Sequence, residues 1–376
     1  MSLAIAVLSA GVGLAAAAPS APAAEPTTLK AALELLVTMP GGPPGAAVIV
    51  HRGHHPRFHS AGVARVGTAD RWQRSDHMRL ASISKAFNGA TALALVRRNR
   101  LSLGDTIGDL LPFAPKAWRA VTLAEALQHT SGLPDFSMNK RFLNLISRRP
   151  HKRFHPRQLI GFVAHKKLNF RPGTRYEYSN TDNIVVGLMI EAASGHSYVH
   201  ELRRLVIRPL GLRETSLPVG ARIRHPFVRG YAFGGPGPPT NVSHVLGMSG
   251  AWASGGMVTS PRDLDRFIRA YVSGRLFGHR LHRRQLRFRP GAGDPPGPGR
   301  NSVGLAIFRW RTPCGTVFGH TGNFPGYTQF AAASRNGHQS VTFSVNTALS
   351  PPATGSQAAL AALRHAEQLA ICAALR

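Results

Sequence analysis

The stretch LASISKAFNG, residues 80–89, places a serine three residues before a lysine in a run that is otherwise apolar or small. Residues three apart on a helix lie on the same face, so the Lys85 ammonium can reach the Ser82 hydroxyl. Burial disfavours the charged form of a lysine, and a neutral lysine can accept a proton from serine. If Ser82 begins the helix, its backbone N–H can also bind an oxyanion. The spacing therefore fits a lysine-activated serine nucleophile, although by itself it also occurs by chance in many helices.

The composition predicts a folded protein with a strongly basic surface. The chain has 376 residues, 43% hydrophobic and 17% charged, which suits one large two-lobed domain or two domains. Its formal net charge of +29 makes a nucleic acid or another polyanion the first partner to test. Basic residues are scattered, with denser patches at 148–157 and 279–289, and no zinc-finger, RNP or basic-zipper pattern accompanies them. We therefore expect no nucleic-acid function and favour a solvated basic surface near an anionic polymer.

The N-terminus and the cysteines suggest export. Residues 1–24 contain an apolar stretch and then small residues and proline, which is typical of a signal peptide. The basic start of such a peptide is missing, and a plain N-terminal helix is the alternative. The chain has 2 cysteines, Cys314 and Cys372. In an exported protein an even pair suggests a disulfide, here between a strand and the C-terminal helix, with two unrelated buried thiols as the alternative.

Strand patterns occur near both ends of the chain, with helical patterns between them. A hairpin is expected within 45–66, and four further β-like runs lie at 302–310, 316–322, 327–334 and 340–347. Helical periodicity marks 82–98, 123–132, 158–167, 182–195, 261–274 and 354–374. The expected fold is α+β, in a domain of residues 30–374. It is an antiparallel sheet built from N- and C-terminal segments, flanked by helices, with an inserted all-helical lobe at roughly 99–300 and a cleft between lobe and sheet.

A second motif, Tyr178-Ser179-Asn180, stands just before a helix. A phenol beside a lysine can relay a proton, and the Asn180 amide can hold both the lysine and a substrate carbonyl. Taken alone, the motif also fits a capping turn.

A third motif, His320-Thr321-Gly322, ends an apolar strand. Thr321 could hydrogen-bond a substrate carboxylate, and Gly322 lets a substrate lie against the strand edge. The backbone N–H of Asn323 could complete an oxyanion hole with that of Ser82. Taken alone, a single histidine near a strand end is more often structural.

In this order and combination, the three motifs resemble the serine β-lactamase and penicillin-binding protein family. The similarity is to the branch with class C β-lactamases and secreted D-alanyl-D-alanine carboxypeptidases of streptomycete type. It extends over roughly residues 30–372 and is carried by LASISKAFNGATAL (80–93), VTLAEALQHTSGLPDF (121–136), PGTRYEYSNTDNIVVGLMIE (172–191), ASGGMVTSPRDLDRF (253–267) and CGTVFGHTGNFPGY (314–327). The resemblance implies a penicillin-binding/β-lactamase-like fold and an acyl-enzyme mechanism. In that mechanism Ser82 is the nucleophile, Lys85 and Tyr178 carry protons, Asn180 positions the substrate and the strand at His320 aligns it.

Differences between this chain and the patterns of individual family branches help to decide which branch it resembles most. Class C β-lactamases typically carry lysine where this chain has His320, whereas the streptomycete-type carboxypeptidases carry H-T-G. Those carboxypeptidases also pair a cysteine before this strand with one in the final helix, which supports a Cys314–Cys372 bridge. Esterases and D-amino-acid peptidases of the family have H-x-G too, and the glutamate loop of class A β-lactamases has no match here.

The function expected from these patterns is that of an exported, monomeric D-alanyl-D-alanine carboxypeptidase. Its substrates would be peptidoglycan stem peptides or small D-peptides, β-lactams would acylate it, and its charge suits anionic cell-wall polymers. The alternatives are a β-lactamase or esterase with the same apparatus, and a non-catalytic relative that binds the wall or another polyanion. Lys85 beside Ser82 argues against the last, since a binding module has no need of it.

Several other residues have a weaker pattern. Trp252 stands where the family often places a residue that lines the cleft, and Arg309 could bind a terminal carboxylate, with a packed aromatic and a surface arginine as the alternatives. His129 is expected to be a structural turn residue. The histidines of the first hairpin lack an associated carboxylate and favour a solvated face over a metal site: His51, His54, His55 and His59. No metal or cofactor is expected, and the absence of G-x-S-x-G disfavours an α/β-hydrolase.

Overall fold

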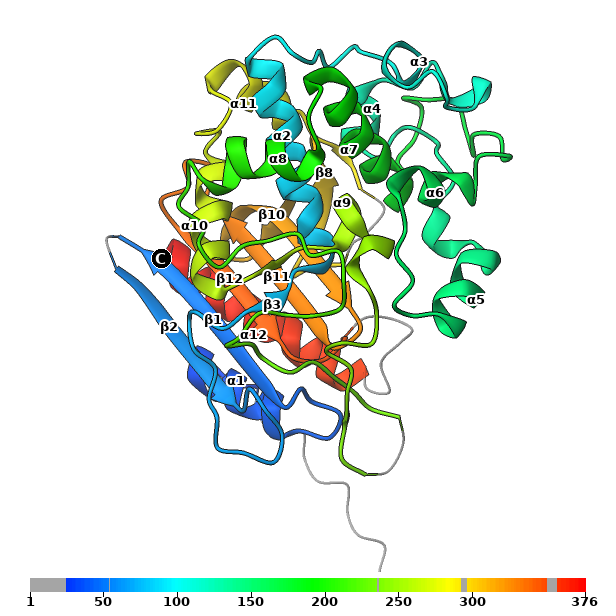
Figure 1. Ribbon diagram of the computed structural model, residues 1–376. Coiled ribbons are helices and arrows are strands. Elements are labelled where there is room, and N and C mark those ends of the chain that lie inside the picture. Colours follow the sequence, from blue (N-terminus) through cyan, green and yellow to red (C-terminus); the bar gives the residue numbers. More distant parts are fainter. Residues whose placement is uncertain (1–24, 54, 235–236, 292–295, 350–356) are drawn as a thin grey trace, which may run out of the picture.

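The computed structural model describes residues 25–53, 55–234, 237–291, 296–349 and 357–376. The expected signal peptide at 1–24 lies outside the described residues. The central feature is an eight-stranded sheet in the order β2-β1-β12-β11-β10-β9-β8-β7 (Figure 1), in which all neighbouring strands pair antiparallel. The strands are β1 (Gly45–Arg52), β2 (His55–Gly62), β7 (Arg289–Pro290), β8 (Arg300–Val303), β9 (Phe308–Thr312), β10 (Gly315–Phe324), β11 (Tyr327–Ala333) and β12 (Ser340–Val345). The N-terminal hairpin joins the C-terminal strands through β1 and β12, which confirms the α+β fold expected from the sequence.

Helices cover both faces of this sheet because the buried strands are apolar on both sides. One face packs against α1 (Leu29–Thr38) and α12 (Gln357–Leu375). The other packs against α10 (Pro261–Val272), which contacts β11, β12 and β1. A disulfide between Cys314 and Cys372 ties the turn before β10 to α12, which confirms the expected bridge. By length and composition α12 could also cross a membrane, but its packing against α1 and the sheet makes it a layer of this fold.

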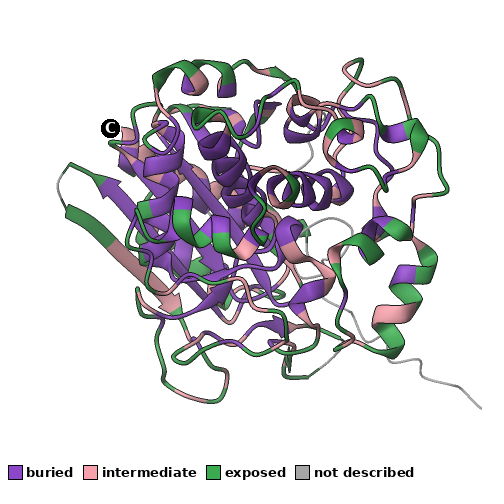
Figure 2. Cartoon of the chain, turned by 45° about the horizontal axis from the view of Figure 1, so that its top comes forward, coloured by how far each residue is buried: buried purple, intermediate pink, exposed green. Residues whose placement is uncertain are grey.

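The helical part of the molecule is built around two buried helices, α2 (Ser84–Arg97) and α7 (Asn180–Ser194), which pack on each other. Their central turns are buried on every side (Figure 2), as the apolar residues on both faces of 82–98 predict. Around them lie α3 (Ile107–Leu110), α4 (Leu123–Leu127), α5 (Lys140–Arg148), α6 (Pro156–Gly161), α8 (Tyr198–Leu202), α9 (Trp252–Gly255) and α11 (His279–Gln285). Short strand pairs complete the fold: β3 (Met78–Arg79) with β6 (Val258–Thr259), and β4 (Tyr231–Ala232) with β5 (Thr240–Asn241).

Three local features differ from the sequence expectations. The strand expected at 302–310 is two strands, β8 and β9, because the chain turns between them at Ala306, where φ is 55°. The helix expected from Ser82 begins at Ser84, after a short 3₁₀ turn over Ala81–Ile83. Helix α10 packs on the sheet although it lies inside the range expected for the inserted lobe. The domain boundaries stay a prediction.

Candidate active site

The turn that carries Ser82 is held in an unusual backbone conformation against β10. Ala81 has a φ of 51°, in the left-handed region that an alanine rarely adopts. A Cβ on Gly322 would overlap the Leu80 carbonyl oxygen and lie 3.3 Å from the Ser82 backbone nitrogen. The glycine is therefore needed so that the strand itself can approach the serine turn, whereas the sequence suggested clearance for a substrate. Close packing of β10 fixes the position of Ser82.

Lys85 lies beneath Ser82 and is almost completely buried. Its Nζ donates hydrogen bonds to Ser82 Oγ at 3.0 Å, to Asn180 Oδ1 at 2.8 Å and to the Ser254 carbonyl at 2.7 Å. The face of the Tyr178 ring lies 4.9 Å from the same nitrogen, close enough for a cation–π contact. These three acceptors could satisfy the three donors of an ammonium group. Ser82 can pass a proton to Lys85 only when the amine is neutral.

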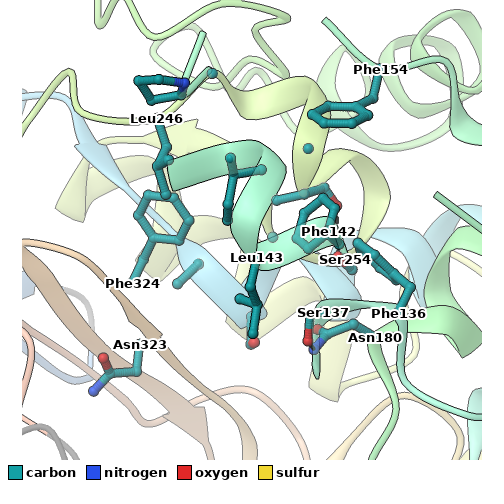
Figure 3. A pocket seen from close by; sticks show the side chains of 18 residues that line it. Phe136, Ser137, Phe142, Leu143, Phe154, Asn180, Leu246, Ser254, Asn323 and Phe324 are labelled. Atoms are coloured by element: carbon teal, nitrogen blue, oxygen red, sulfur yellow. Dashed lines mark hydrogen bonds between the residues drawn. The ribbon is translucent and has the colours of Figure 1, made fainter. Parts of the chain in front are cut away.

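The amide of Asn180 has one fixed orientation. Its Nδ2 donates to Asp135 Oδ2 at 3.0 Å and to Ser137 Oγ at 2.9 Å, which turns Oδ1 toward Lys85. Figure 3 shows Ser137 beside Asn180 at one end of the pocket. The sequence analysis missed Asp135 and Ser137. The signal for them is the LPDFS segment, in which Asp135 also caps the short helical turn that follows.

Tyr178 packs on a buried histidine-carboxylate pair. The His129 ring lies 4.5 Å from the Tyr178 ring, and His129 Nδ1 lies 2.7 Å from Asp182 Oδ2. Ser131 donates to the other carboxylate oxygen of Asp182. Burial raises the pKa of Asp182 well above its ordinary range, while the Ser131 hydrogen bond and the charge of Lys85 act in the opposite direction. His129 occupies a tight turn, with a φ of 53°, and also supports the tyrosine ring.

His320 is buried behind these groups and does not line the pocket. Its Nδ1 lies 2.6 Å from the Thr321 carbonyl oxygen and donates to it, and its ring contacts Phe308 edge to face. Burial, together with the nearby charge of Lys85, lowers the pKa of His320 to about 3. The imidazole is therefore neutral near pH 7 and cannot act there as a proton-donating cation. Thr321 is buried as well.

Two residues expected in the cleft lie elsewhere. The Trp252 ring packs against Gly187 of α7 and edge to face on Tyr198, and it does not line the pocket. Arg309 lies over the Phe288 ring and donates from Nε to Ser302 Oγ at 2.9 Å, away from the pocket lining. Each of these two side chains has partners in its own layer, as the alternatives of a packed aromatic and a surface arginine describe, and substrate binding by either stays a prediction.

The pocket above Ser82 is apolar, with a volume of about 260 Å³. Phe136, Phe142 and Phe154 form an aromatic wall, with ring centroids 5.1 Å apart for the first two and 5.7 Å for the last two. The described residues of its lining are Ala81, Ser82, Phe136, Ser137, Phe142, Leu143, Ile146, Pro150, Phe154, Asn180, Leu246, Gly247, Gly250, Ala251, Ser254, Gly255, Asn323 and Phe324 (Figure 3). None of these described residues has a charged side chain, which is unusual in a chain with a net charge of +29. Asn323 belongs to this lining, and the oxyanion hole expected from its backbone N–H stays a prediction.

Metal chemistry has no candidate ligands in the part of the chain that the structure describes. Within it, no group of three or more His, Cys, Asp or Glu side chains is close enough together to hold a metal ion.

Comparison with known proteins identifies the family. The model of the family described as Beta-lactamase matches residues 34–366. Penicillin-binding protein 4* of Bacillus subtilis is 27% identical over 76% of this chain and 64% of its own length. The D-alanyl-D-alanine-carboxypeptidase/endopeptidase AmpH of Escherichia coli is 26% identical over 63% of this chain and 59% of its own length. The match thus spans less than two thirds of either relative.

Solved structures share the fold. A D-stereospecific amidohydrolase from Streptomyces sp. has a TM-score of 0.77 and 26% identity, over 90% of this chain and 97% of its own. The D-amino acid amidase of Ochrobactrum anthropi SV3 has a TM-score of 0.79 at 22% identity, over 92% of this chain and 96% of its own. With a family model that covers most of the chain and a serine-lysine pair at the foot of its pocket, this protein belongs to the β-lactamase and penicillin-binding protein family of serine hydrolases.

Proposed function

We propose that this protein hydrolyses amide bonds next to D-amino acids through an acyl-enzyme on Ser82. The observation that carries the proposal is the Ser82–Lys85–Asn180 hydrogen-bond chain at the foot of an apolar pocket. Ser82 Oγ attacks the substrate carbonyl carbon, the C–N bond breaks and the amine leaves with a proton, and water then cleaves the ester. Tyr178 and Lys85 carry the protons between these groups.

The pocket supports a substrate that has an apolar acyl side chain and no terminal carboxylate. The described residues of its lining include no lysine or arginine, so they provide no cation for a terminal carboxylate, and Arg309 is engaged elsewhere. Its aromatic wall suits a benzyl-sized group, since aromatic pairs gain energy beyond the area they bury. D-Amino-acid amides with an aromatic side chain combine both properties. The similarity to a D-stereospecific amidohydrolase supports the same substrate class.

The second candidate is the D-alanyl-D-alanine carboxypeptidase activity expected from the sequence. It is favoured by the similarity to AmpH, which carries that activity in its name. In this case Thr321 would receive the terminal carboxylate, and peptidoglycan stem peptides would be the natural substrates. Hydrolysis of β-lactams or of short esters would use the same Ser82–Lys85 pair, so both substrates are included in the test below.

The test has two stages. A fluorescent penicillin should label the wild-type protein, and the Ser82→Ala variant should remain unlabelled, with the partly exposed Ser75→Ala variant as a matched control for the substitution itself. Initial rates are then compared on D-phenylalanine amide, L-phenylalanine amide, a D-alanyl-D-alanine peptide, nitrocefin and a short-chain ester. We expect D-phenylalanine amide to be the fastest substrate. Labelling of Ser82→Ala would refute the nucleophile, and a faster D-alanyl-D-alanine peptide would favour the second candidate.

We also propose that the protein works outside the cytoplasm. The Cys314–Cys372 disulfide supports this, because such bonds persist in oxidising compartments. Mass spectrometry of the non-reduced protein isolated from the medium or the cell envelope tests it. We expect a single cross-linked peptide pair, and two alkylatable thiols would refute the proposal.

A further inference from the structure

A second hollow lies on the face of the sheet that α10 covers, at the edge formed by the N-terminal hairpin β1–β2. Helix α10 contacts β11, β12 and β1, and β2 extends beyond β1 as the edge strand (Figure 1). The space between the helix and the hairpin has a volume of about 220 Å³. Its lining is Ile49, His51, Pro56, Phe58, Arg74, Arg262, Asp265, Arg266 and Arg269. It shares no lining residue with the pocket above Ser82.

Four arginines converge on this hollow. Arg262, Arg266 and Arg269 recur at helical spacing on one face of α10, and Arg74 joins them from the loop before β3. Like charges at this spacing repel one another. Two of the guanidinium groups are held in place: Arg269 Nε donates to the Gly337 carbonyl at 2.9 Å, and Arg266 Nη1 donates to the Gly211 carbonyl at 2.9 Å. The cluster is therefore positioned by the fold.

The neighbouring carboxylates neutralise only part of this positive charge. Asp265 is buried and receives His51 Nδ1 at 3.0 Å and Ser340 Oγ at 2.5 Å. Glu214 pairs with Arg262 at 2.7 Å from outside the hollow. Two engaged carboxylates thus face four guanidinium groups, and the excess charge is positive.

The same geometry corrects one expectation from the sequence. His51 was expected on a solvated face without a carboxylate nearby, but it is 5% exposed and paired with Asp265. Helix α10 brings Asp265 next to His51 across a sequence separation of 214 residues. Because the carboxylate accepts from Nδ1, it fixes the orientation of the imidazole at the side of the hollow.

We propose that this hollow binds a phosphate group. Guanidinium groups bind phosphate oxygens through paired, charge-assisted hydrogen bonds, and several converging arginines distinguish such a site from a generally basic surface. The phosphate comes either from inorganic phosphate or from a phosphodiester repeat of an anionic polymer. The site is independent of the hydrolytic pocket, so catalysis does not require it.

The experiment compares two variants with the same change of charge. R74Q/R266Q removes two exposed arginines of the hollow, and R283Q/R284Q removes two exposed arginines of α11. Each protein is titrated calorimetrically with inorganic phosphate and with a glycerol-phosphate oligomer at fixed ionic strength. We expect affinity for at least one probe to fall about tenfold in R74Q/R266Q and less than about twofold in R283Q/R284Q. Penicillin labelling should be unchanged in both.

The outcomes separate a built site from diffuse attraction. Binding of inorganic phosphate identifies the free ion as the source, and binding of the oligomer alone identifies the polymer. Equal losses in the two variants, or no binding of either probe to the wild type, would overturn the proposal. If thermal unfolding shows that R74Q/R266Q is destabilised through the lost Gly211 contact, R74Q alone replaces it, with a loss of about threefold expected. An unchanged affinity in R74Q would then be the contradicting result.

Discussion

The two sides of the pocket over Ser82 are held together by different forces. The polar floor, formed by Ser82 and Asn180 over Lys85, is directional: each hydrogen bond fixes one orientation of its donor and acceptor. The aromatic wall, formed by Phe136, Phe142 and Phe154, is held by contact between rings. A protein tolerates a change of shape or volume in such a contact better than it tolerates the loss of a buried hydrogen bond. The floor therefore determines which reaction occurs. The wall determines which acyl group is accepted.

Breaking the floor should have the largest effect. In Lys85→Met the side chain keeps its approximate volume but loses the ammonium, so the acceptors on Ser82, Asn180 and Ser254 lose their donor. We expect the rate of acylation by a labelled penicillin to fall by about 10³-fold or more, because proton transfer and positioning are lost together. Stopped-flow or gel-based labelling measures the rate.

The matched control for this change is Lys30→Met, at an exposed position of α1. It removes the same charge and should acylate like the wild type. Circular dichroism checks that both variants fold. An acylation rate in Lys85→Met within tenfold of the wild type would mean that the lysine is not part of the reactive group.

Changing the wall should have a smaller and more selective effect. Phe142 packs between Phe136 and Phe154 and lines the pocket, so Phe142→Ala opens the space for the acyl side chain. We expect KM for D-phenylalanine amide to rise about tenfold with kcat within about twofold, and kinetics on D-alanine amide to change little. Steady-state kinetics on the two amides provide the measurement.

Phe162 supplies the control for the wall. Its ring lies 5.3 Å from that of Phe142, but it does not line the pocket. Phe162→Ala therefore disturbs the same aromatic cluster without removing a contact to the substrate. If it shifts the substrate preference as much as Phe142→Ala does, the effect belongs to the cluster, and the wall does not select the acyl group.

The polar floor could be predicted from the sequence, and the aromatic wall could not. Ser82 and Lys85 lie three residues apart at the start of a helical segment, so local backbone geometry brings their side chains to the same face. Asn180 follows from a short motif at the start of α7. The wall residues Phe136, Phe142 and Phe154 come from three separate segments, and only tertiary packing decides that they meet.

In the sheet, too, features with a local sequence pattern could be predicted, and features set by tertiary packing could not. Runs of alternating and apolar residues marked most of its strands, and the disulfide agreed with the expected cysteine pair. The break between β8 and β9 was missed because Ala306 adopts a left-handed conformation that its residue type does not signal. Trp252 and Arg309 are expected in the cleft from their position in the sequence alone. Their side-chain directions depend on Gly187 and Phe288, which only the folded chain brings near.

The last expected effect is on stability and concerns His320, which lies buried behind the floor and close to the charge of Lys85. Its pKa falls from 6.5 to about 3 on folding, so between these values the unfolded chain binds a proton that the native protein does not. The free energy of unfolding should therefore decrease as the pH falls through that window, by about 1.4 kcal/mol per pH unit from this group. Asp182 acts in the opposite direction, since its raised pKa lets the native protein bind a proton first, and it is common to the wild type and any His320 variant. Urea unfolding of the wild type and His320→Gln at pH 7, 6, 5 and 4 isolates the histidine. The wild type should lose stability more steeply than the variant, and parallel curves would mean that protonation of His320 does not oppose the native floor.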